Sequence, residues 1–191
     1  KPSSFLAATA MACPPDLLLR AKSSTPKSFA FVRAIGAATL QTAWDAAKAG
    51  IVIPILVGEP DIIASDAAAI GWDLSDVEII PATGEREAID EAIALFAAGR
   101  VAGLAKGQLH TDVFMGGIVR RTAGIRTGNR LLHIFAMLPP AGGRPLLISD
   151  AAVNVAPDID TRVEAAMYVA EMGRQLGQPC PRIAILSATE S

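Results

Sequence analysis

Residues 51–57 read IVIPILV, an uninterrupted apolar run in which β-branched residues predominate. A run this short, without polar alternation and bounded by Gly50 and Gly58, is typical of a strand buried on both faces. Pro54 cannot donate a hydrogen bond to a neighbouring strand, so we expect it near the beginning of the strand or at an edge of the sheet. The run therefore predicts a strand in the interior of an α/β protein.

Helical patterns lie on both sides of this strand, and the alternation continues along the chain. Leu40, Trp44 and Ala47 recur at helical spacing and predict a helix over residues 36–49. Similar patterns predict strands at 28–34, 77–80, 101–105, 131–138, 146–148 and 182–186, and helices at 61–70, 84–98, 113–121 and 158–176. Strands that alternate with amphipathic helices form a largely parallel sheet covered on both faces. We therefore expect an α/β fold with a mostly parallel sheet, in which residues 139–145 make one hairpin connection.

The two ends of the chain suggest how it is organised. Residues 1–26 are rich in Pro, Ser and Ala with one short helical patch at 16–21, and they read as a leader or linker. Residues 27–191 form the α/β region. The chain starts at Lys1 without Met and ends at Ser191, directly after an expected strand. We therefore expect a fragment of a larger fold, incomplete at its C-terminus.

Composition excludes several classes of function. The chain has 191 residues, of which 51% are hydrophobic, 19% charged and 5% aromatic, and its net charge is −2. A nucleic-acid-binding surface would need a basic or aromatic excess, which is absent. Cys13 and Cys180 are far apart, which argues against a zinc site or a disulfide framework and fits the cytoplasm. No apolar run approaches the ~20 residues of a membrane span.

Residues 145–158, PLLISDAAVNVAPD, read as a buried strand followed by a polar loop and a helix start. Asp158 is placed to cap that helix, and Asp150 and Asn154 lie in the loop. Ligands of open α/β sheets bind where such loops follow the strands. The alternative is an ordinary connection in which Asp150 and Asn154 form turns with nearby backbone groups.

Three polar loops follow expected strands, at residues 106–112, 149–154 and 187–191. In one parallel sheet their strand ends would share an edge, so we expect the loops to converge. They supply a cation and hydroxyl groups that suit an anion such as phosphate: Lys106, Thr111, Ser187 and Thr189. No His, Cys or carboxylate cluster has metal-ligand spacing. The glycine-rich dinucleotide and P-loop motifs and the nucleophile elbow are also absent.

Two further features are candidates for function. The loop at residues 124–130, GIRTGNR, carries Arg126 and Arg130, which either bind phosphate groups or form a solvated turn. Of the two histidines, His133 lies in an apolar segment typical of a core histidine. His110 lies in a polar loop and is the better functional candidate.

Five segments in order resemble the phosphate acetyl/butyryltransferase family. They are AWDAAKAGIVIPILVGEPDII, AKGQLHTD, GIRTGNRLLHIF, PLLISDAAVNVAPDID and PRIAILSATES, within residues 28–191. The segments are most similar to the phosphate butyryltransferase-like branch and to the acyltransferase part of bifunctional enoyl-CoA hydratase/phosphate acetyltransferases. The resemblance implies a two-domain fold like that of isocitrate and isopropylmalate dehydrogenases, with the active site between the domains, and a homodimer.

The implied reaction converts acyl-CoA and phosphate to acyl phosphate and CoA. CoA is then a substrate, and no metal or other cofactor is required. The matched positions assign Lys106, Thr111, Ser187 and Thr189 to phosphate or acyl phosphate. They assign Asp150 and Asn154 to hydrogen bonds that shape the cleft, and Arg126 and Arg130 to the phosphates of CoA. The chain departs from the family at residues 115–117, Met-Gly-Gly, where members often carry a basic or polar residue.

Two other functions are alternatives to acyl transfer. The chain could be a non-catalytic or truncated relative that binds phosphate or CoA without turnover, which Gly116 and the expected missing C-terminal half favour. An oxidoreductase of the isocitrate dehydrogenase-like fold would need a carboxylate cluster for a divalent metal, which the sequence does not show.

Overall fold

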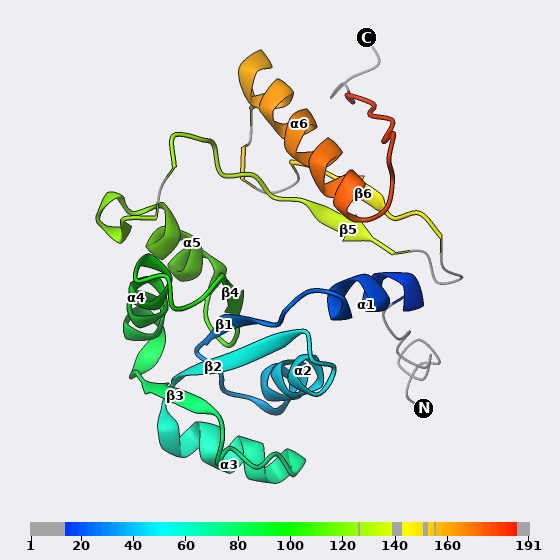
Figure 1. Cartoon of the computed structure of the whole chain (residues 1–191). Coiled ribbons are helices and arrows are strands. Elements are labelled where there is room, and N and C mark those ends of the chain that lie inside the picture. Colours follow the sequence, from blue (N-terminus) through cyan, green and yellow to red (C-terminus); the bar gives the residue numbers. More distant parts are fainter. Residues whose placement is uncertain (1–13, 126, 139–142, 151–152, 155, 187–191) are drawn as a thin grey trace, which may run out of the picture. The chain divides into compact units, whose positions relative to one another are not determined.

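The computed structural model describes residues 14–125, 127–138, 143–150, 153–154 and 156–186. Residue contacts divide the chain into two compact units. Leu19–Thr127 form what we call the parallel-sheet unit, and Lys1–Leu18 with Gly128–Ser191 form the hairpin unit. Each unit has its own sheet, of four and two strands respectively (Figure 1).

The parallel-sheet unit is built on four strands in the order β3-β2-β1-β4. They are β1 (Lys27–Val32), β2 (Val52–Gly58), β3 (Glu78–Pro81) and β4 (Gly103–Lys106), and all pairs are parallel. The chain proceeds outward from β1 to β3 and then returns to place β4 on the other side of β1. This reversal makes the carboxyl ends of β1 and β4 a topological switch point, where α/β sheets bind ligands.

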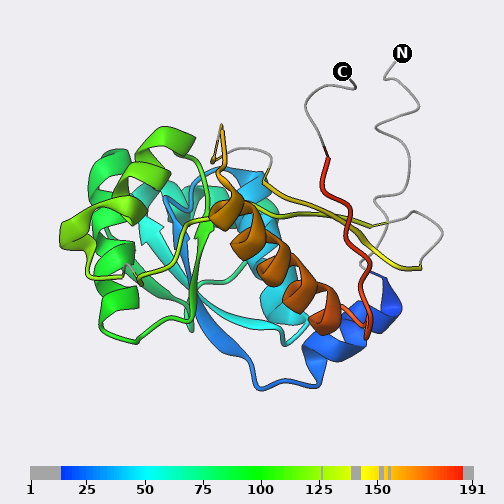
Figure 2. The same cartoon turned by 90° about the horizontal axis from the view of Figure 1, so that it is seen from above.

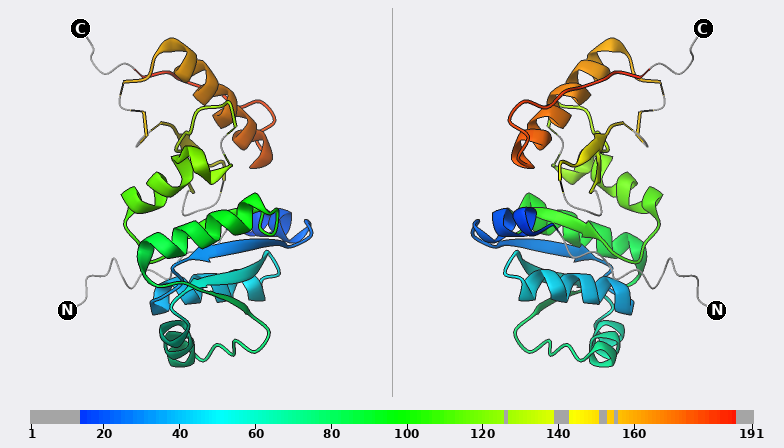
Figure 3. Two further views of the ribbon diagram at one scale, coloured as in Figure 1. Left: turned by 90° about the vertical axis from the view of Figure 1, so that its left-hand side faces the viewer. Right: turned by 90° about the vertical axis from the view of Figure 1, so that its right-hand side faces the viewer.

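Helices cover both faces of this sheet. They are α2 (Ala37–Lys48), α3 (Pro60–Ile70), α4 (Gly84–Ala97) and α5 (Thr111–Val119), with a short 3-10 helix, η1 (Arg121–Ala123), after α5. Ala30 and Val32 point to the core under α4, whereas Phe31 packs with α2 and α3 on the other face. Figure 3 shows α2 and α4 on opposite sides of β1. The expected α/β class and the parallel sheet with helices on both faces are thus confirmed.

The strand at residues 51–57 is β2, with both neighbours in place. Its carboxyl half, Ile55–Gly58, pairs with β3, while β1 pairs along the whole strand. Pro54 therefore lies just before the doubly paired part, near the beginning of β2. This position agrees with the expectation from its missing N–H group.

Close packing explains one of the two glycines in α5. A Cβ atom at Gly117 would lie 2.5 Å from Ile89 Cγ1 on α4. No atom lies within 4 Å of the corresponding position at Gly116. Gly117 therefore lets α5 approach α4, whereas Gly116 has no such packing role.

The hairpin unit pairs β5 (Phe135–Met137) with β6 (Leu146–Ile148) in antiparallel fashion. Helix α6 (Ile159–Gln175) contacts β6 (Figures 1 and 2). The side chain of Asp158 accepts a hydrogen bond from the Thr161 N–H at 2.9 Å, so the predicted N-cap is confirmed. The antiparallel pairing of β5 and β6 agrees with the expected hairpin, and residues 139–142 of its connection lie outside the described residues. Helix α1 (Pro15–Lys22), in the expected leader segment, has no buried residue.

Three predictions in this part of the chain need correction: the extent of one strand, the existence of another and the burial of a third. The segment 131–138 forms only the short strand β5, and residues 182–186 form no strand. The strand at 146–148 exists but is not buried, because Leu146 is 63% and Ile148 43% exposed. Apolar character predicts a tendency to form strands, but a strand and its burial both depend on neighbours that the local sequence does not specify.

Candidate functional site

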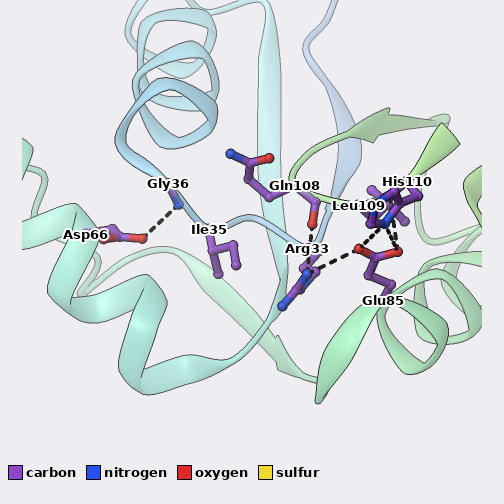
Figure 4. Close-up of a pocket in the computed structure, with 8 residues that line it drawn as sticks. All are labelled: Arg33, Ile35, Gly36, Asp66, Glu85, Gln108, Leu109 and His110. Carbon is purple, nitrogen blue, oxygen red and sulfur yellow. Dashed lines mark hydrogen bonds and ion pairs between the residues drawn. The ribbon is translucent and has the colours of Figure 1, made fainter.

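A pocket of about 590 Å³ lies at the switch point of the parallel sheet (Figure 4). Two loops supply most of its wall, one after β1 and one after β4, and α3 and α4 complete it. The lining residues are Arg33, Ile35, Gly36, Asp66, Glu85, Gln108, Leu109 and His110. The pocket thus combines one guanidinium, two carboxylates and one imidazole in a volume that suits a small molecule.

Backbone contacts hold the two loops together beyond the ends of their strands. The Gly107 N–H donates to Val32 O at 2.9 Å, and the Gln108 N–H donates to Arg33 O at 3.0 Å. A Cβ at Gly107 would lie 2.5 Å from Arg33 O, so only glycine permits this approach. The pocket wall is therefore fixed by the backbone.

Arg33 links all the elements around the pocket. Its Nε and Nη2 atoms donate to Glu59 Oε1 at 3.3 and 3.2 Å, and Nη1 donates to Gln108 O at 3.2 Å. Nη1 also lies 3.5 Å from Glu85 Oε1. Each nitrogen of the guanidinium is engaged, so Arg33 serves here as a cross-link between strand ends.

Glu59, which follows β2, remains ionised beside Arg33. Partial burial opposes ionisation, but the Gly84 N–H at 3.0 Å and the Arg33 guanidinium outweigh it and lower the pKa of Glu59. The same carboxylate thus connects β2, the start of α4 and the loop after β1.

Glu85 on α4 holds His110 in a defined orientation. Its pKa is lowered, first by the hydrogen bond from the His110 backbone N–H and also by the His110 side chain. His110 Nδ1 lies 2.8 and 3.0 Å from the two carboxylate oxygens. An ionised carboxylate only accepts hydrogen bonds, so the contact with Glu85 requires a proton on Nδ1. The His110 side chain is 80% exposed.

Asp66 completes the pocket on the α3 side. Its Oδ2 atom accepts a hydrogen bond from the Gly36 N–H at 2.7 Å, just before α2 begins. Glu59 and Glu85 contact the guanidinium of Arg33, and Asp66 adds a further carboxylate to the pocket lining. A phosphate ion at this site would need cations or N–H donors beyond Arg33.

The predicted residues Lys106 and Thr111 flank the loop that lines the pocket. Lys106 is the last residue of β4, Thr111 is the first residue of α5, and both side chains are exposed. Neither lines the pocket itself.

The other predicted residues belong to the hairpin unit or lie outside the described residues. Asp150 accepts hydrogen bonds from the Val153 and Asn154 N–H groups, both at 3.1 Å, and Asn154 Nδ2 donates to Leu131 O at 3.1 Å. The bonds to Asp150 are the turn contacts of the alternative interpretation, whereas the Asn154 bond joins this loop to a residue 23 positions earlier. Arg130 Nη2 lies 3.3 Å from Asp158 Oδ2. Arg126, Ser187 and Thr189 are outside the described residues.

One premise of the site prediction was wrong. The loops at 106–112 and 149–154 follow strands of different sheets, because β6 pairs only with β5 among the described strands. A shared sheet edge therefore gives no reason for these two loops to converge.

The sequence reasoning missed Arg33, Glu59 and Glu85. Arg33 and Glu59 directly follow β1 and β2 at the carboxyl edge of the sheet. Both therefore satisfy the criterion that predicts the loop at 106–112, namely a polar residue directly after the carboxyl end of a parallel strand. Glu85 lies in the first turn of α4, where the helix dipole alone explains an acidic residue, so the local sequence carries no specific signal for it.

The described part of the chain holds no group of three or more His, Cys, Asp or Glu side chains that could bind a metal ion. It also contains no helix of the length and apolar character that a membrane crossing requires.

Comparisons with known proteins identify relatives that match most of this chain. The family model of phosphate acetyl/butaryl transferases matches residues 85–191. A phosphate acetyltransferase of Rickettsia felis is 35% identical over 179 residues, which cover 92% of this chain and 51% of that protein. A phosphate butyryltransferase of Clostridium acetobutylicum is 28% identical over 175 residues, covering 92% and 58%.

A solved structure shows the same fold. A phosphotransacetylase from Streptococcus pyogenes superposes with a TM-score of 0.71 at 16% identity, over 85% of this chain and 59% of that one. The chain spans about half the length of the curated relatives it matches.

Proposed function

Because the chain belongs to the phosphate acetyl/butaryl transferase family, we propose that it acts in the transfer of an acetyl or butyryl group between CoA and inorganic phosphate. In this reaction acyl-CoA and phosphate give acyl phosphate and CoA. The observation that carries the proposal is the position of the pocket at the switch point, with four lining residues inside the family match: Glu85, Gln108, Leu109 and His110.

The phosphate subsite is proposed at the start of α5, beside the pocket. Lys106 supplies a cation at the end of β4, and Thr111 supplies a hydroxyl in the first turn of the helix. The unpaired N–H groups and the dipole of a helix N-terminus favour an anion. Because Arg33 is held by Glu59 and Glu85, Lys106 is the cation that we assign to phosphate. Ser187 and Thr189 remain proposed further contacts.

The CoA assignment extends to the hairpin unit. Arg126 and Arg130 are proposed to bind CoA phosphates, and Asp150 and Asn154 to shape the cleft by hydrogen bonding. CoA acts as a substrate, and the reaction needs no metal or other cofactor, since positioning two substrates supplies much of the rate. A homodimer in the cytoplasm is the proposed setting.

A lysine substitution tests the proposal. We expect Lys106→Met to raise the KM for phosphate roughly 10-fold or more, because a charge-assisted hydrogen bond contributes about 1.5–3 kcal/mol. Lys27→Met is the matched control, because Lys27 begins β1 at the opposite end of the same sheet. The assay is phosphate- or arsenate-dependent loss of acetyl-CoA and butyryl-CoA. Equal phosphate KM values for the two variants would contradict the phosphate subsite.

Binding without turnover is the second candidate function. Gly116 favours it, because family members often carry a basic or polar residue at positions 115–117 and this glycine has no packing role. Titration calorimetry with CoA distinguishes the two functions. Heat of binding with no loss of either acyl-CoA supports the binding function, and turnover rules it out.

A further inference from the structure

Arg33 holds one residue of the neighbouring loop with both its backbone and its side chain. Arg33 O accepts a hydrogen bond from the Gln108 N–H at 3.0 Å, and Arg33 Nη1 donates to Gln108 O at 3.2 Å. Both polar groups of the Gln108 backbone are therefore bonded to the same residue. We propose that Arg33 is a positioning residue of the phosphate subsite, because it places the loop between Lys106 and Thr111; this inference rests on the proposed acyl transfer.

The backbone of Arg33 adopts a conformation that disfavours a side chain. Its φ is +50°, and no other non-glycine residue in the described part of the chain has a positive φ. Contact between Cβ and the backbone makes this region unfavourable for residues other than glycine. Such conformations persist where the surrounding structure holds them, and they are concentrated at functional sites. Glycine would fit this conformation better, so the presence of an arginine indicates a role for its side chain.

The guanidinium also reaches the start of α5 through Glu85. Arg33 Nη1 lies 3.5 Å from Glu85 Oε1, and Glu85 Oε2 accepts the backbone N–H of His110 at 3.1 Å. His110 is the N-cap residue of α5, so it precedes the first turn of that helix. Figure 4 shows Arg33 between Glu85 and the backbone oxygen of Gln108. The direction of the N–H groups at the start of α5 therefore depends on Arg33.

Glu59 anchors the other side of the guanidinium. Its Oε1 atom accepts hydrogen bonds from Arg33 Nε and Nη2, and it also accepts the Gly84 N–H. The Arg33 and Glu59 side chains are only 24% and 17% exposed, so salt screens this pair less than a surface pair. Each nitrogen of the guanidinium already has a partner among these groups. We therefore assign Arg33 to the loop and not to phosphate itself.

The phosphate subsite depends on this loop because its proposed contacts lie at the two ends of residues 107–110. Lys106 ends β4, and Thr111 begins α5. The ammonium group and the start of the helix must face the same anion for the subsite to form. A misplacement of about 1 Å can cost roughly 100-fold in an enzyme reaction. Loss of the Arg33 contacts is therefore expected to weaken the binding of phosphate.

Arg33→Gly removes the guanidinium and permits the observed backbone conformation. We expect it to raise the KM for phosphate roughly 10-fold or more and to leave the KM for acetyl-CoA unchanged. A substitution that only destabilises the fold reduces the amount of active enzyme, which lowers the apparent kcat and leaves KM unchanged. Arg100→Gly is the matched control, because Arg100 pairs with Glu78 at the amino end of the same sheet.

A second variant guards against the charge that Arg33→Gly leaves without its partner. The combination of Arg33→Gly with Glu59→Gln removes both members of the ion pair, so no unpaired carboxylate remains beside β2. It still lacks the contact with Gln108 O. We expect the raised KM for phosphate to persist in this variant, and circular dichroism checks that each variant is folded.

Amide NMR with inorganic phosphate gives a readout that does not depend on turnover. We expect phosphate to shift the amide signals of residues 111–113 in the unmodified chain and in Arg100→Gly. The same phosphate concentrations are expected to leave these signals unchanged in Arg33→Gly. Hydrogen exchange at the Gln108 amide is expected to be faster in Arg33→Gly than in the unmodified chain, because the loop is then held by fewer contacts.

The outcomes distinguish this inference from the proposed function. An unchanged phosphate KM in Arg33→Gly, or a normal KM in the variant that also carries Glu59→Gln, would overturn the positioning role and leave the acyltransferase in place. Absence of acyl transfer in the unmodified chain would refute the proposed function. A phosphate-dependent shift that is lost in Arg33→Gly would then still support the positioning role. Absence of any shift in the unmodified chain would overturn the phosphate subsite together with the role of Arg33.

Discussion

The contact between α4 and α5 permits a sharp test of the packing, because two adjacent glycines differ in their surroundings. We predict that Gly117→Ala destabilises the chain relative to Gly116→Ala. A Cβ at position 117 would lie 2.5 Å from Ile89 Cγ1 and 3.2 Å from Ile93 Cδ1, whereas position 116 has no atom within 4 Å. Both substitutions are in α5, so the gain in helix propensity is common to both.

The magnitude follows from the space available. Carbon atoms pack favourably at about 3.5–4.0 Å, so the new methyl and Ile89 must separate by roughly 1 Å. Ile89 is fully buried and cannot turn into solvent. Overpacking of this kind costs about 1–3 kcal/mol, and Gly→Ala in a helix contributes up to about 1 kcal/mol. We therefore expect Gly116→Ala to be stabilising and Gly117→Ala to be less stable than it by about 1–3 kcal/mol.

Urea unfolding followed by circular dichroism measures both free energies of unfolding. A double-mutant cycle with Ile89→Ala identifies the cause, because the cost of the Gly117→Ala substitution is expected to disappear when the Ile89 side chain is removed. If Gly117→Ala is as stable as Gly116→Ala, or if its cost persists in the Ile89→Ala background, the packing explanation is refuted.

Two further predictions concern the strand ends and the cap of α6. Gly107→Ala is expected to destabilise more than Gly117→Ala in the same unfolding assay, because its Cβ would lie 2.5 Å from Arg33 O, a backbone atom that cannot rotate away; a smaller effect would contradict the close approach of the two loops. The Thr161 hydroxyl and N–H lower the pKa of Asp158 in the folded state. The ionised Asp158 side chain therefore stabilises the folded chain above the pKa of an unfolded carboxyl, and this stabilisation is lost as pH falls below about 4. We therefore expect Asp158→Ala to be less stable than the control Asp160→Ala at pH 7, with a difference that shrinks in acid; an equal difference at pH 7 and pH 3 would argue against the cap.

Much of the fold could be predicted from local pattern. The apolar run at 51–57 and the helical spacing of Leu40 and Trp44 predicted β2 and α2, and Asp158 predicted the start of α6. Each of these features depends on residues a few positions apart, which is the range over which periodicity and capping act. The segment at 182–186 has a similar apolar character but forms no strand, because pairing depends on a neighbour.

The candidate site, like the fold, could be predicted from local sequence only in part. Strand-end reasoning located the loop at 106–112 and favoured His110, and the family resemblance pointed to acyl transfer. The sequence by itself therefore determined the strands and helices of the parallel-sheet unit, the start of α6 and the position of one site loop. Only the tertiary structure placed β1 between β2 and β4 and brought Arg33 beside Glu85, 52 positions away, and Glu85 beside His110, 25 positions away. Strand order is decided by packing of the whole core, and contacts between distant residues follow from that order rather than from any local pattern.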